Sequence, residues 1–149
     1  MPFQIFSNAF AEGGWIPALH SCEGADLSPS LEWSGVPAGA RSFSLILEDP
    51  DAPAGVWCHW LLYDIGAAIH ALPQGSRPGT LGLSGVNDFG KPGYGGPCPP
   101  SGTHRYYFKL YALNTELNLP SSTTKQDLLK AMYGHILDEG QLIGRYKKQ

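Results

Sequence analysis

The stretch from residue 73 to residue 102 constrains the fold most, because half of it is glycine or proline. Fifteen of these 30 residues are Gly or Pro, and no strand or helix periodicity runs through them. Proline interrupts helices and central strands, so this stretch is predicted to be a long loop. A loop of this length in a compact domain is usually functional or disordered. Leu81, Leu83, Val86 and Phe89 supply apolar anchors that favour an ordered loop.

Apolar and alternating runs on both sides of the loop predict β-strands. Residues 42–48 place Phe43, Leu45 and Leu47 on one face. Residues 57–65 are largely apolar on both faces, which predicts a central strand covered on two sides. Residues 104–113 read as a half-exposed strand, and shorter strands are expected at 3–6 and 141–146.

The alternation within 57–65 also assigns side chains to faces. It places His59, Leu61 and Tyr63 on one face and Cys58 on the opposite face. We therefore expect Cys58 and Cys98 not to be bonded to each other, because Cys98 lies in the loop expected near His59.

One helix is expected late in the chain. Thr124 and Asp127 form a capping-box pattern, and apolar residues recur at helical spacing as far as Leu137. Gly134 is expected to bend the helix and Gly140 to end it. Residues 1–149 are thus predicted to form a single, mainly β domain of Greek-key sandwich character with one helix in the C-terminal region.

Composition excludes several classes of function. The chain is 42% hydrophobic with four tryptophans, which predicts a folded domain. Only 15% of residues are charged and the net charge is −3, which argues against nucleic acid as a partner. No apolar run of about 18 residues predicts a transmembrane segment, and the first residues do not read as a signal peptide.

The cysteine count bears on the compartment. Three cysteines, an odd number without C-x-x-C spacing, indicate neither a disulfide framework nor a zinc site. We therefore expect three free thiols and a cytoplasmic, reduced protein.

Familiar catalytic motifs are absent or incomplete. Residues 85–92 match a P-loop except at the last position, where Pro92 offers no hydroxyl for a magnesium ion, so nucleotide hydrolysis is not expected. The five histidines are scattered without metal-ligand spacing, so no metal site is predicted. A hydrolase that uses Ser101 or His104 stays as an alternative.

Polar residues gather where the predicted strands begin and end. Asp49 follows one strand, His59 lies on the next, and His104 and Tyr106 open a third beside the Gly96–Pro97 loop. If these strands are neighbours, two imidazoles, a phenol and loop N–H groups converge. Such a group of donors suits a small anion such as phosphate.

The turn between the first two of these strands has its own expectation. Asp49-Pro50-Asp51-Ala52-Pro53 must return the chain beside the candidate site within five residues. A cis proline is a recurrent device in such tight turns, so we predict a cis Ala52–Pro53 peptide bond.

The same residues resemble a known family, the phosphatidylethanolamine-binding proteins (PEBP), also called Raf kinase inhibitor proteins. Four motifs in the same order carry the resemblance: Asp49-Pro50-Asp51-Ala52-Pro53, Trp57-x-His59-Trp60, Gly96-Pro97-x-Pro99-Pro100-x-Gly102 and His104-Arg105-Tyr106. The Gly-Gly-Pro-Cys-Pro-Pro sequence resembles that of the bacterial and archaeal branch of the family, the Raf kinase inhibitor-like or YbhB/YbcL type.

The resemblance implies an antiparallel β-sandwich and a pocket that binds phosphate-type anions or phospholipid head groups. The implied ligand-binding residues are Asp49, Pro53, Trp57, His59, Gly96, Pro97, His104 and Tyr106. It implies a non-enzymatic protein without cofactor or metal, acting as a regulator or inhibitor of a partner such as a kinase or protease. A pure interaction module and a homodimer stay open. Eukaryotic members carry a C-terminal helix beside the pocket, whereas this chain stops nine residues after Gly140, which favours anion binding over lipid binding.

Overall fold

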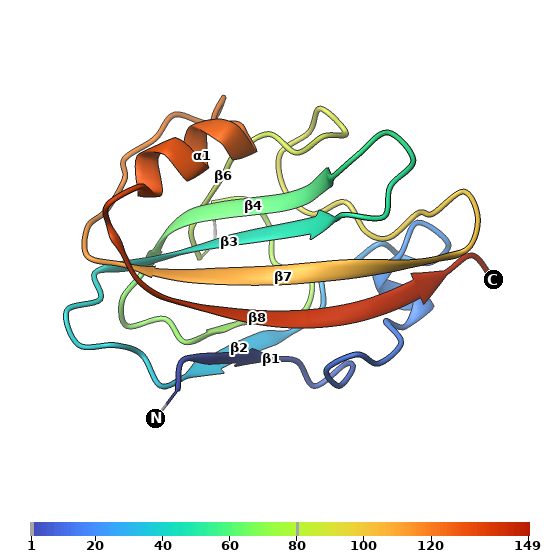
Figure 1. The fold of residues 1–149 in the computed structure, drawn as a ribbon, viewed down its shortest axis with the longest axis horizontal. Helices are drawn as coiled ribbons and strands as arrows, with labels where there is room; N and C mark the ends of the chain where they lie inside the picture. Colours follow the sequence, from blue (N-terminus) through green and yellow to red (C-terminus); the bar gives the residue numbers. More distant parts are fainter. Residues whose placement is uncertain (1, 80) are drawn as a thin grey trace.

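Two antiparallel β-sheets lie face to face in the computed structural model, which describes residues 2–79 and 81–149 (Figure 1). The smaller sheet has the order β1-β2-β5 and the larger one the order β6-β4-β3-β7-β8. The strands are β1 (Gln4–Phe6), β2 (Leu31–Ser34), β3 (Ser42–Asp49), β4 (Trp57–Gly66), β5 (Ala71–Leu72), β6 (Leu83–Ser84), β7 (Thr103–Leu113) and β8 (Ile136–Lys147). A 3-10 helix, η1 (Ala18–His20), and one α-helix, α1 (Lys125–Met132), complete the described elements. The predicted mainly β sandwich with one helix is confirmed.

The topology places β4 and β7, the long strands before and after the Gly/Pro-rich loop, on either side of β3. β3 pairs with β4 on one side and with β7 on the other, although β4 and β7 are separated in sequence by the Gly/Pro-rich stretch. The end of β3 and the starts of β4 and β7 therefore meet at one end of the larger sheet (Figure 1). This is the arrangement that the candidate site required.

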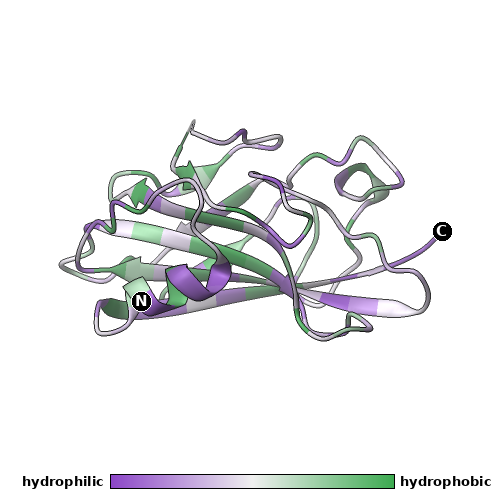
Figure 2. Cartoon of the chain, turned by 90° about the horizontal axis from the view of Figure 1, so that it is seen from above, coloured by the Kyte–Doolittle hydropathy of each residue, from purple (hydrophilic) through white to green (hydrophobic). Residues whose placement is uncertain are grey.

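The main core fills the space between the two sheets. Phe43, Leu45 and Leu47 of β3 share this core, as their alternation predicts, and they pack against Ile5, Leu31 and Trp33 of the smaller sheet. Hydrophobic bands follow the strands in Figure 2, while helix α1 carries hydrophilic ones. Burial at about 25 cal/mol per Å² of apolar surface makes this layer the main source of stability.

A second apolar cluster covers the other face of the larger sheet, beneath α1. Leu128 and Met132 of the helix pack on residues of β3, β4 and β7, namely Ile46, Cys58, Leu61, Tyr63, Tyr111 and Leu113. Glu48, buried on β3, accepts hydrogen bonds from Lys109 of β7 and from Lys125 at the start of the helix. Burial raises the pKa of Glu48, but the two lysines lower it by more than burial raises it. The net effect is a lowered pKa, so the carboxylate stays charged. The strand β4 is thus covered on both faces, as predicted.

Helix α1 begins as the sequence indicates and ends earlier. The Thr124 side chain accepts a hydrogen bond from the Asp127 N–H, and the Asp127 carboxylate accepts one from the Thr124 N–H, which confirms the capping box. The expected continuation to Leu137 is wrong, because the helix stops at Met132. Gly134 has φ +82°, a left-handed conformation that ends a helix. The last strand consequently begins at Ile136 and not at residue 141.

Two irregularities in β4 overturn the expectation that His59, Leu61 and Tyr63 share one face. Leu47 of β3 pairs with Trp60, whereas the next residue, Glu48, pairs with Cys58, so His59 is an extra residue in the ladder. A second shift lies before Ile65, next to Asp64, whose φ is +53°. Such bulges re-aim side chains. Cys58 joins the cluster under the helix, while His59 faces the opposite side, toward Tyr106.

The structure corrects the expectation of three free thiols. Cys22 and Cys98 form a disulfide, with their Cα atoms 5.4 Å apart, and Cys58 is free and buried. Cys58 and Cys98 are indeed not bonded to each other, as predicted. The pair was not visible in the sequence, because 76 residues separate its members and only the fold brings them together. The inference of a reduced, cytoplasmic protein from the cysteines therefore loses its basis, since disulfides persist mainly in oxidising compartments.

The predicted cis peptide bond is also wrong. The described residues contain no cis peptide bond, and Ala52–Pro53 is trans. The turn closes instead through the Asp49 carboxylate, which accepts a hydrogen bond from the Asp51 N–H, and through Gly55, which has φ +113°.

In the part of the chain that the structure describes, no helix is long and apolar enough to cross a bilayer.

Candidate functional site

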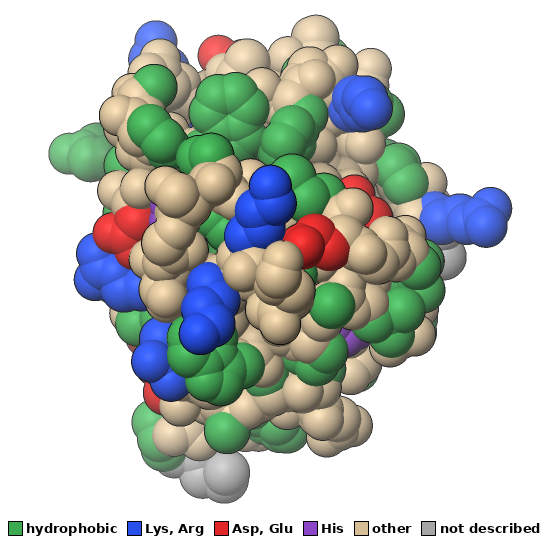
Figure 3. All heavy atoms as spheres, turned by 90° about the vertical axis from the view of Figure 1, so that its right-hand side faces the viewer, with side chains coloured by type: hydrophobic (Ala, Val, Ile, Leu, Met, Phe, Trp, Pro, Cys, Tyr) green, Lys and Arg blue, Asp and Glu red, His purple; other side chains and the backbone are tan. Residues whose placement is uncertain are grey.

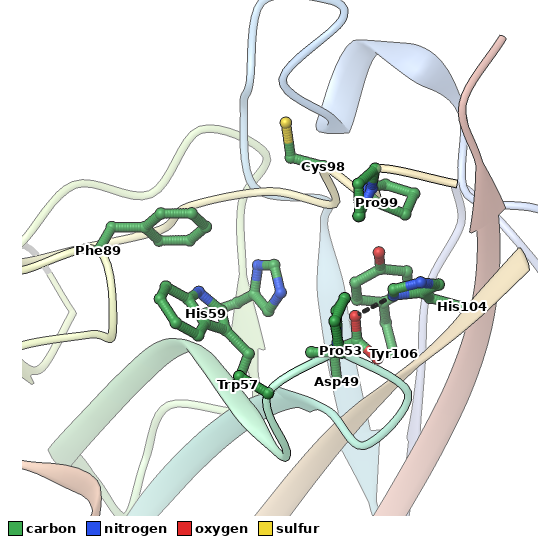
Figure 4. A pocket seen from close by; sticks show the side chains of 12 residues that line it. Asp49, Pro53, Trp57, His59, Phe89, Cys98, Pro99, His104 and Tyr106 are labelled. Atoms are coloured by element: carbon green, nitrogen blue, oxygen red, sulfur yellow. Dashed lines mark hydrogen bonds and ion pairs between the residues drawn. The ribbon is translucent and has the colours of Figure 1, made fainter. Parts of the chain in front are cut away.

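A pocket of about 320 Å³ opens at the end of the larger sheet where β3, β4 and β7 meet (Figure 4). Its wall comes from the end of β3, the turn after it, the start of β4, the Gly/Pro-rich loop and the start of β7. The lining residues are Asp49, Ala52, Pro53, Ala54, Trp57, His59, Phe89, Cys98, Pro99, Pro100, His104 and Tyr106. Six of the eight residues that the sequence nominated are thus brought together around one cavity.

Asp49 and His104 form a buried pair at the side of this pocket. The Nδ1 atom of His104 lies 2.6 Å from Oδ2 of Asp49, and both side chains are almost fully buried. Because a carboxylate only accepts hydrogen bonds, Nδ1 carries the proton and the tautomer is fixed. The other ring nitrogen of His104, Nε2, is left for a ligand. A charged His104 ring would be stabilised by this carboxylate.

His59 is held in the same way by a backbone carbonyl. Its Nδ1 donates to the Gly95 oxygen at 2.7 Å, and the Gly95 N–H donates to the His59 oxygen at 3.0 Å. Burial lowers the pKa of His59, and the hydrogen bond to Gly95 offsets part of this effect. The neutral ring therefore presents the Nε2 lone pair, and a bound anion is required to favour an N–H at that position.

Tyr106 brings a hydroxyl group into the site that finds no hydrogen-bond partner among the residues that the structure describes. The Tyr106 side chain is fully buried, and its oxygen makes no hydrogen bond to any described residue. Burial raises the pKa of Tyr106 well above its usual range, and the nearby Asp49 carboxylate adds to this effect. The ring stands between the two histidines, 5.3 Å from His59 and 6.5 Å from His104 between centroids. A buried donor without a partner costs about 1–3 kcal/mol, which is typical of a functional site.

Gly96 and Pro97 do not line the pocket, but they attach its loop to the segment that contains Cys22 and Asp26. The Gly96 N–H donates to the Asp26 carboxylate at 2.8 Å, and the Pro97 carbonyl accepts from the Cys22 N–H at 3.0 Å. A Cβ at Gly96 would lie 2.1 Å from the His20 oxygen, so only glycine fits there. The expectation that loop N–H groups of this segment point at a ligand is therefore not met at Gly96.

Apolar lining residues that the sequence had not nominated form the rim of the pocket. Phe89 packs edge-on against both Trp57 and His59, and Pro99 lies above Tyr106 (Figure 4). The sequence indicated Phe89 only as an apolar anchor of the loop. On the corresponding side of the molecule, hydrophobic side chains reach the surface among scattered lysines and arginines (Figure 3). The polar groups thus lie deep and the entrance is apolar, a common form for a small-molecule site.

The turn that carries Pro53 is fastened to β7 outside the pocket. The Asp51 carboxylate accepts hydrogen bonds from the Arg105 backbone and from its guanidinium at 2.8–2.9 Å. This contact with Arg105 lowers the pKa of Asp51 to about 2. Asp51 and Asp49, two residues apart, therefore have different tasks: Asp51 holds the turn, and Asp49 orients an imidazole.

The chain is similar to known proteins both in sequence and in structure. Residues 6–147 match the family model described as phosphatidylethanolamine-binding protein. The chain is 47% identical to a UPF0098 protein of Methanothermobacter thermautotrophicus over 97% of this chain and 99% of that protein. A crystal structure of a PEBP homologue from Chlamydia trachomatis superposes with a TM-score of 0.95 at 41% identity, covering 99% of both chains. E. coli YbcL, described as a member of the mammalian PEBP family, gives a TM-score of 0.92 at 34% identity over 100% of both chains.

Proposed function

The chain belongs to the phosphatidylethanolamine-binding protein family, and from that premise we propose that its pocket binds a small phosphate-type anion between His59 and His104. Binding without chemical turnover is the activity proposed. Regulation of a protein partner would follow from the occupancy of this pocket.

The observation that carries the proposal is that both imidazoles have the same hydrogen-bonding arrangement, with Nδ1 bound within the protein and Nε2 left for a ligand. Nδ1 of each ring is bound to an oxygen acceptor, Gly95 for His59 and Asp49 for His104. In the neutral ring, Nε2 is therefore an acceptor, and it becomes a donor only when the ring is protonated. Two such rings, with the unpartnered Tyr106 hydroxyl between them, offer up to three donors to one anion.

The pocket's other walls restrict which anions fit. Its volume of about 320 Å³ is at the lower end for ligand sites, and its rim is formed by proline and aromatic side chains. None of the described residues that line it is a lysine or an arginine, so the positive charge has to come from the histidines. This arrangement favours an anion whose binding is coupled to proton uptake.

The test is a titration with inorganic phosphate and with phosphoethanolamine, followed by calorimetry and by the imidazole NMR signals. We expect saturable binding with shifts confined to the signals of His59 and His104, and at least tenfold weaker binding in His104→Gln, because a hydrogen bond to a charged group contributes about 1.5–3 kcal/mol. His135→Gln is the matched control, since His135 is exposed and its Nδ1 contacts Asn114 at the far end of the sheet. Absence of saturable shifts in the parent protein would contradict the proposal.

The same samples distinguish binding from hydrolysis. The Asp49–His104 pair is also the arrangement that a general base requires, so the hydrolase alternative is tested with it. Release of inorganic phosphate from the phosphoethanolamine probe, abolished in His104→Gln, would replace the binding proposal with a hydrolase. Ser101, the other nominated residue, is exposed and does not line the pocket.

Tyr106→Phe is expected to act in opposite directions on stability and on binding. Removal of a buried hydroxyl without a partner raises the free energy of unfolding by about 1 kcal/mol. Loss of the same hydroxyl weakens phosphate binding by roughly fivefold to tenfold if it donates to the anion. Urea unfolding and calorimetry measure the two effects on one variant. Lower stability with unchanged affinity would show that the hydroxyl has only a structural task.

A further inference from the structure

The Cys22–Cys98 disulfide fastens one wall of the pocket to a segment that lies outside it. Cys98 lines the pocket and is followed by two further lining residues, Pro99 and Pro100. Its partner, Cys22, lies just beyond η1 and does not line that pocket. We call residues 98–102 the roof segment, because Pro99 is placed over Tyr106 in Figure 4.

Hydrogen bonds hold the chain up to the roof segment but not within it. Tyr94, Gly96 and Pro97 are bonded to His20, Asp26 and Cys22, respectively. Within the described part of the chain, residues 98–102 make no hydrogen bond, and regular pairing resumes at Thr103 of β7. The disulfide is thus the last tether before β7.

We infer that this disulfide controls the affinity of the pocket, so that the oxidised protein holds the anion and a reduced protein releases it. The inference rests on the proposed function and adds its regulation. Removal of the tether frees a five-residue segment that contains two prolines and one glycine, Pro99, Pro100 and Gly102. The pocket is complete only in the fraction of molecules whose roof segment stays in place, and the apparent affinity falls by that fraction.

The reaction that opens the tether is an ordinary thiol–disulfide exchange with a small dithiol or two monothiols. A reductant thiolate attacks one protein sulfur, the bond between Cys22 and Cys98 breaks, and the displaced sulfur leaves as a thiolate. The second reductant thiol resolves the mixed disulfide. Two electrons pass to the protein, two protons complete its thiols, and the reductant leaves as a disulfide. Both cysteines are exposed, so the reductant has access to them.

The first test compares phosphate affinity at one pH with and without dithiothreitol, an uncharged reductant that does not compete for an anion site. We expect the reduced protein to bind roughly fivefold to tenfold more weakly. Cys22→Ser cuts the tether without changing a pocket-lining residue, and we expect it to bind weakly at either redox state. Cys58→Ala keeps the disulfide and is the matched control, which should retain the response of the parent.

A second measurement follows the attachment of the roof segment without any ligand. On reduction, amide hydrogen exchange at Cys22 and Gly96, whose N–H groups donate to Pro97 and Asp26 beside the disulfide, should accelerate, while the amides in the middle of β7 stay protected. If the oxidised protein binds phosphate and reduction leaves its affinity unchanged, the redox inference is overturned and the anion site stands. If neither form binds phosphate, the proposed function fails and the inference fails with it.

Discussion

Asp49→Asn is expected to weaken anion binding by roughly tenfold to a hundredfold, although it removes a negative charge from beside an anion site. The physical reason is the pair with His104, in which the carboxylate accepts from Nδ1 and stabilises the charged ring. A hydrogen bond of this kind to a charged group contributes about 1.5–3 kcal/mol, and each 1.4 kcal/mol changes the affinity tenfold. Simple electrostatic repulsion predicts the opposite sign.

The measurement uses sulfate, because phosphate itself changes its charge within the pH range in which histidines titrate, whereas sulfate does not. We expect the affinity of the parent for sulfate to rise as the pH falls, by up to about one log unit per pH unit for each proton taken up with the anion. His59, whose pKa is lowered by burial, should gain its proton only with the anion bound or at the lower end of the range. Asp49→Asn should flatten this dependence of the sulfate affinity on pH.

Asp51→Asn is the matched control for charge. It removes the same charge two residues away, from a carboxylate that pairs with Arg105 and not with an imidazole. Its sulfate affinity should stay within about a factor of three of the parent. Tighter sulfate binding in Asp49→Asn, or an affinity of the parent that is independent of pH, would contradict the mechanism.

The strands and the capped start of the helix were predictable because local patterns decide them. Alternation in residues 42–48 and the reciprocal cap of Thr124 and Asp127 depend on neighbours in sequence, and both are present in the structure. The end of the helix was missed since apolar spacing continued to Leu137 while the left-handed Gly134 redirected the chain. The ability of this glycine to adopt a left-handed conformation is a stronger signal for a helix end than the apolar spacing is for continuation.

The sequence predicted the site only to the extent that its residues lie at the ends of strands that are neighbours in the sheet. Asp49, His59, His104 and Tyr106 lie on three adjacent strands, and the sequence indicated each strand. The direction of the His59 side chain depends on a bulge, which shifts the pairing of β3 with β4 by one residue. The alternation of apolar and polar residues in the sequence does not reveal this bulge. The tasks of Phe89 as a rim residue and of Gly96 as a close-packed support depend on tertiary contacts between distant segments. Local patterns contain no information about such contacts.

Reduction of the Cys22–Cys98 disulfide is expected to lower the free energy of unfolding by about 4 kcal/mol. The bond closes a loop with a sequence separation of 76 residues, and the entropy that it removes from the unfolded chain grows with the logarithm of that length. For a domain of this size, the midpoint of thermal unfolding should fall on the order of 10 °C. Unfolding curves of the parent with and without dithiothreitol measure the effect.

Two controls isolate the disulfide in that experiment. Denatured, oxidised protein should contain one reactive thiol, that of Cys58, and three after reduction. Cys22→Ser should unfold at the same midpoint with and without dithiothreitol. Equal midpoints for the parent in both states, with the thiol count changing from one to three, would contradict the expectation. A loss of stability without a loss of phosphate affinity would mean that the bond acts on the unfolded chain alone, whereas a loss of both would place part of its action in the native roof segment.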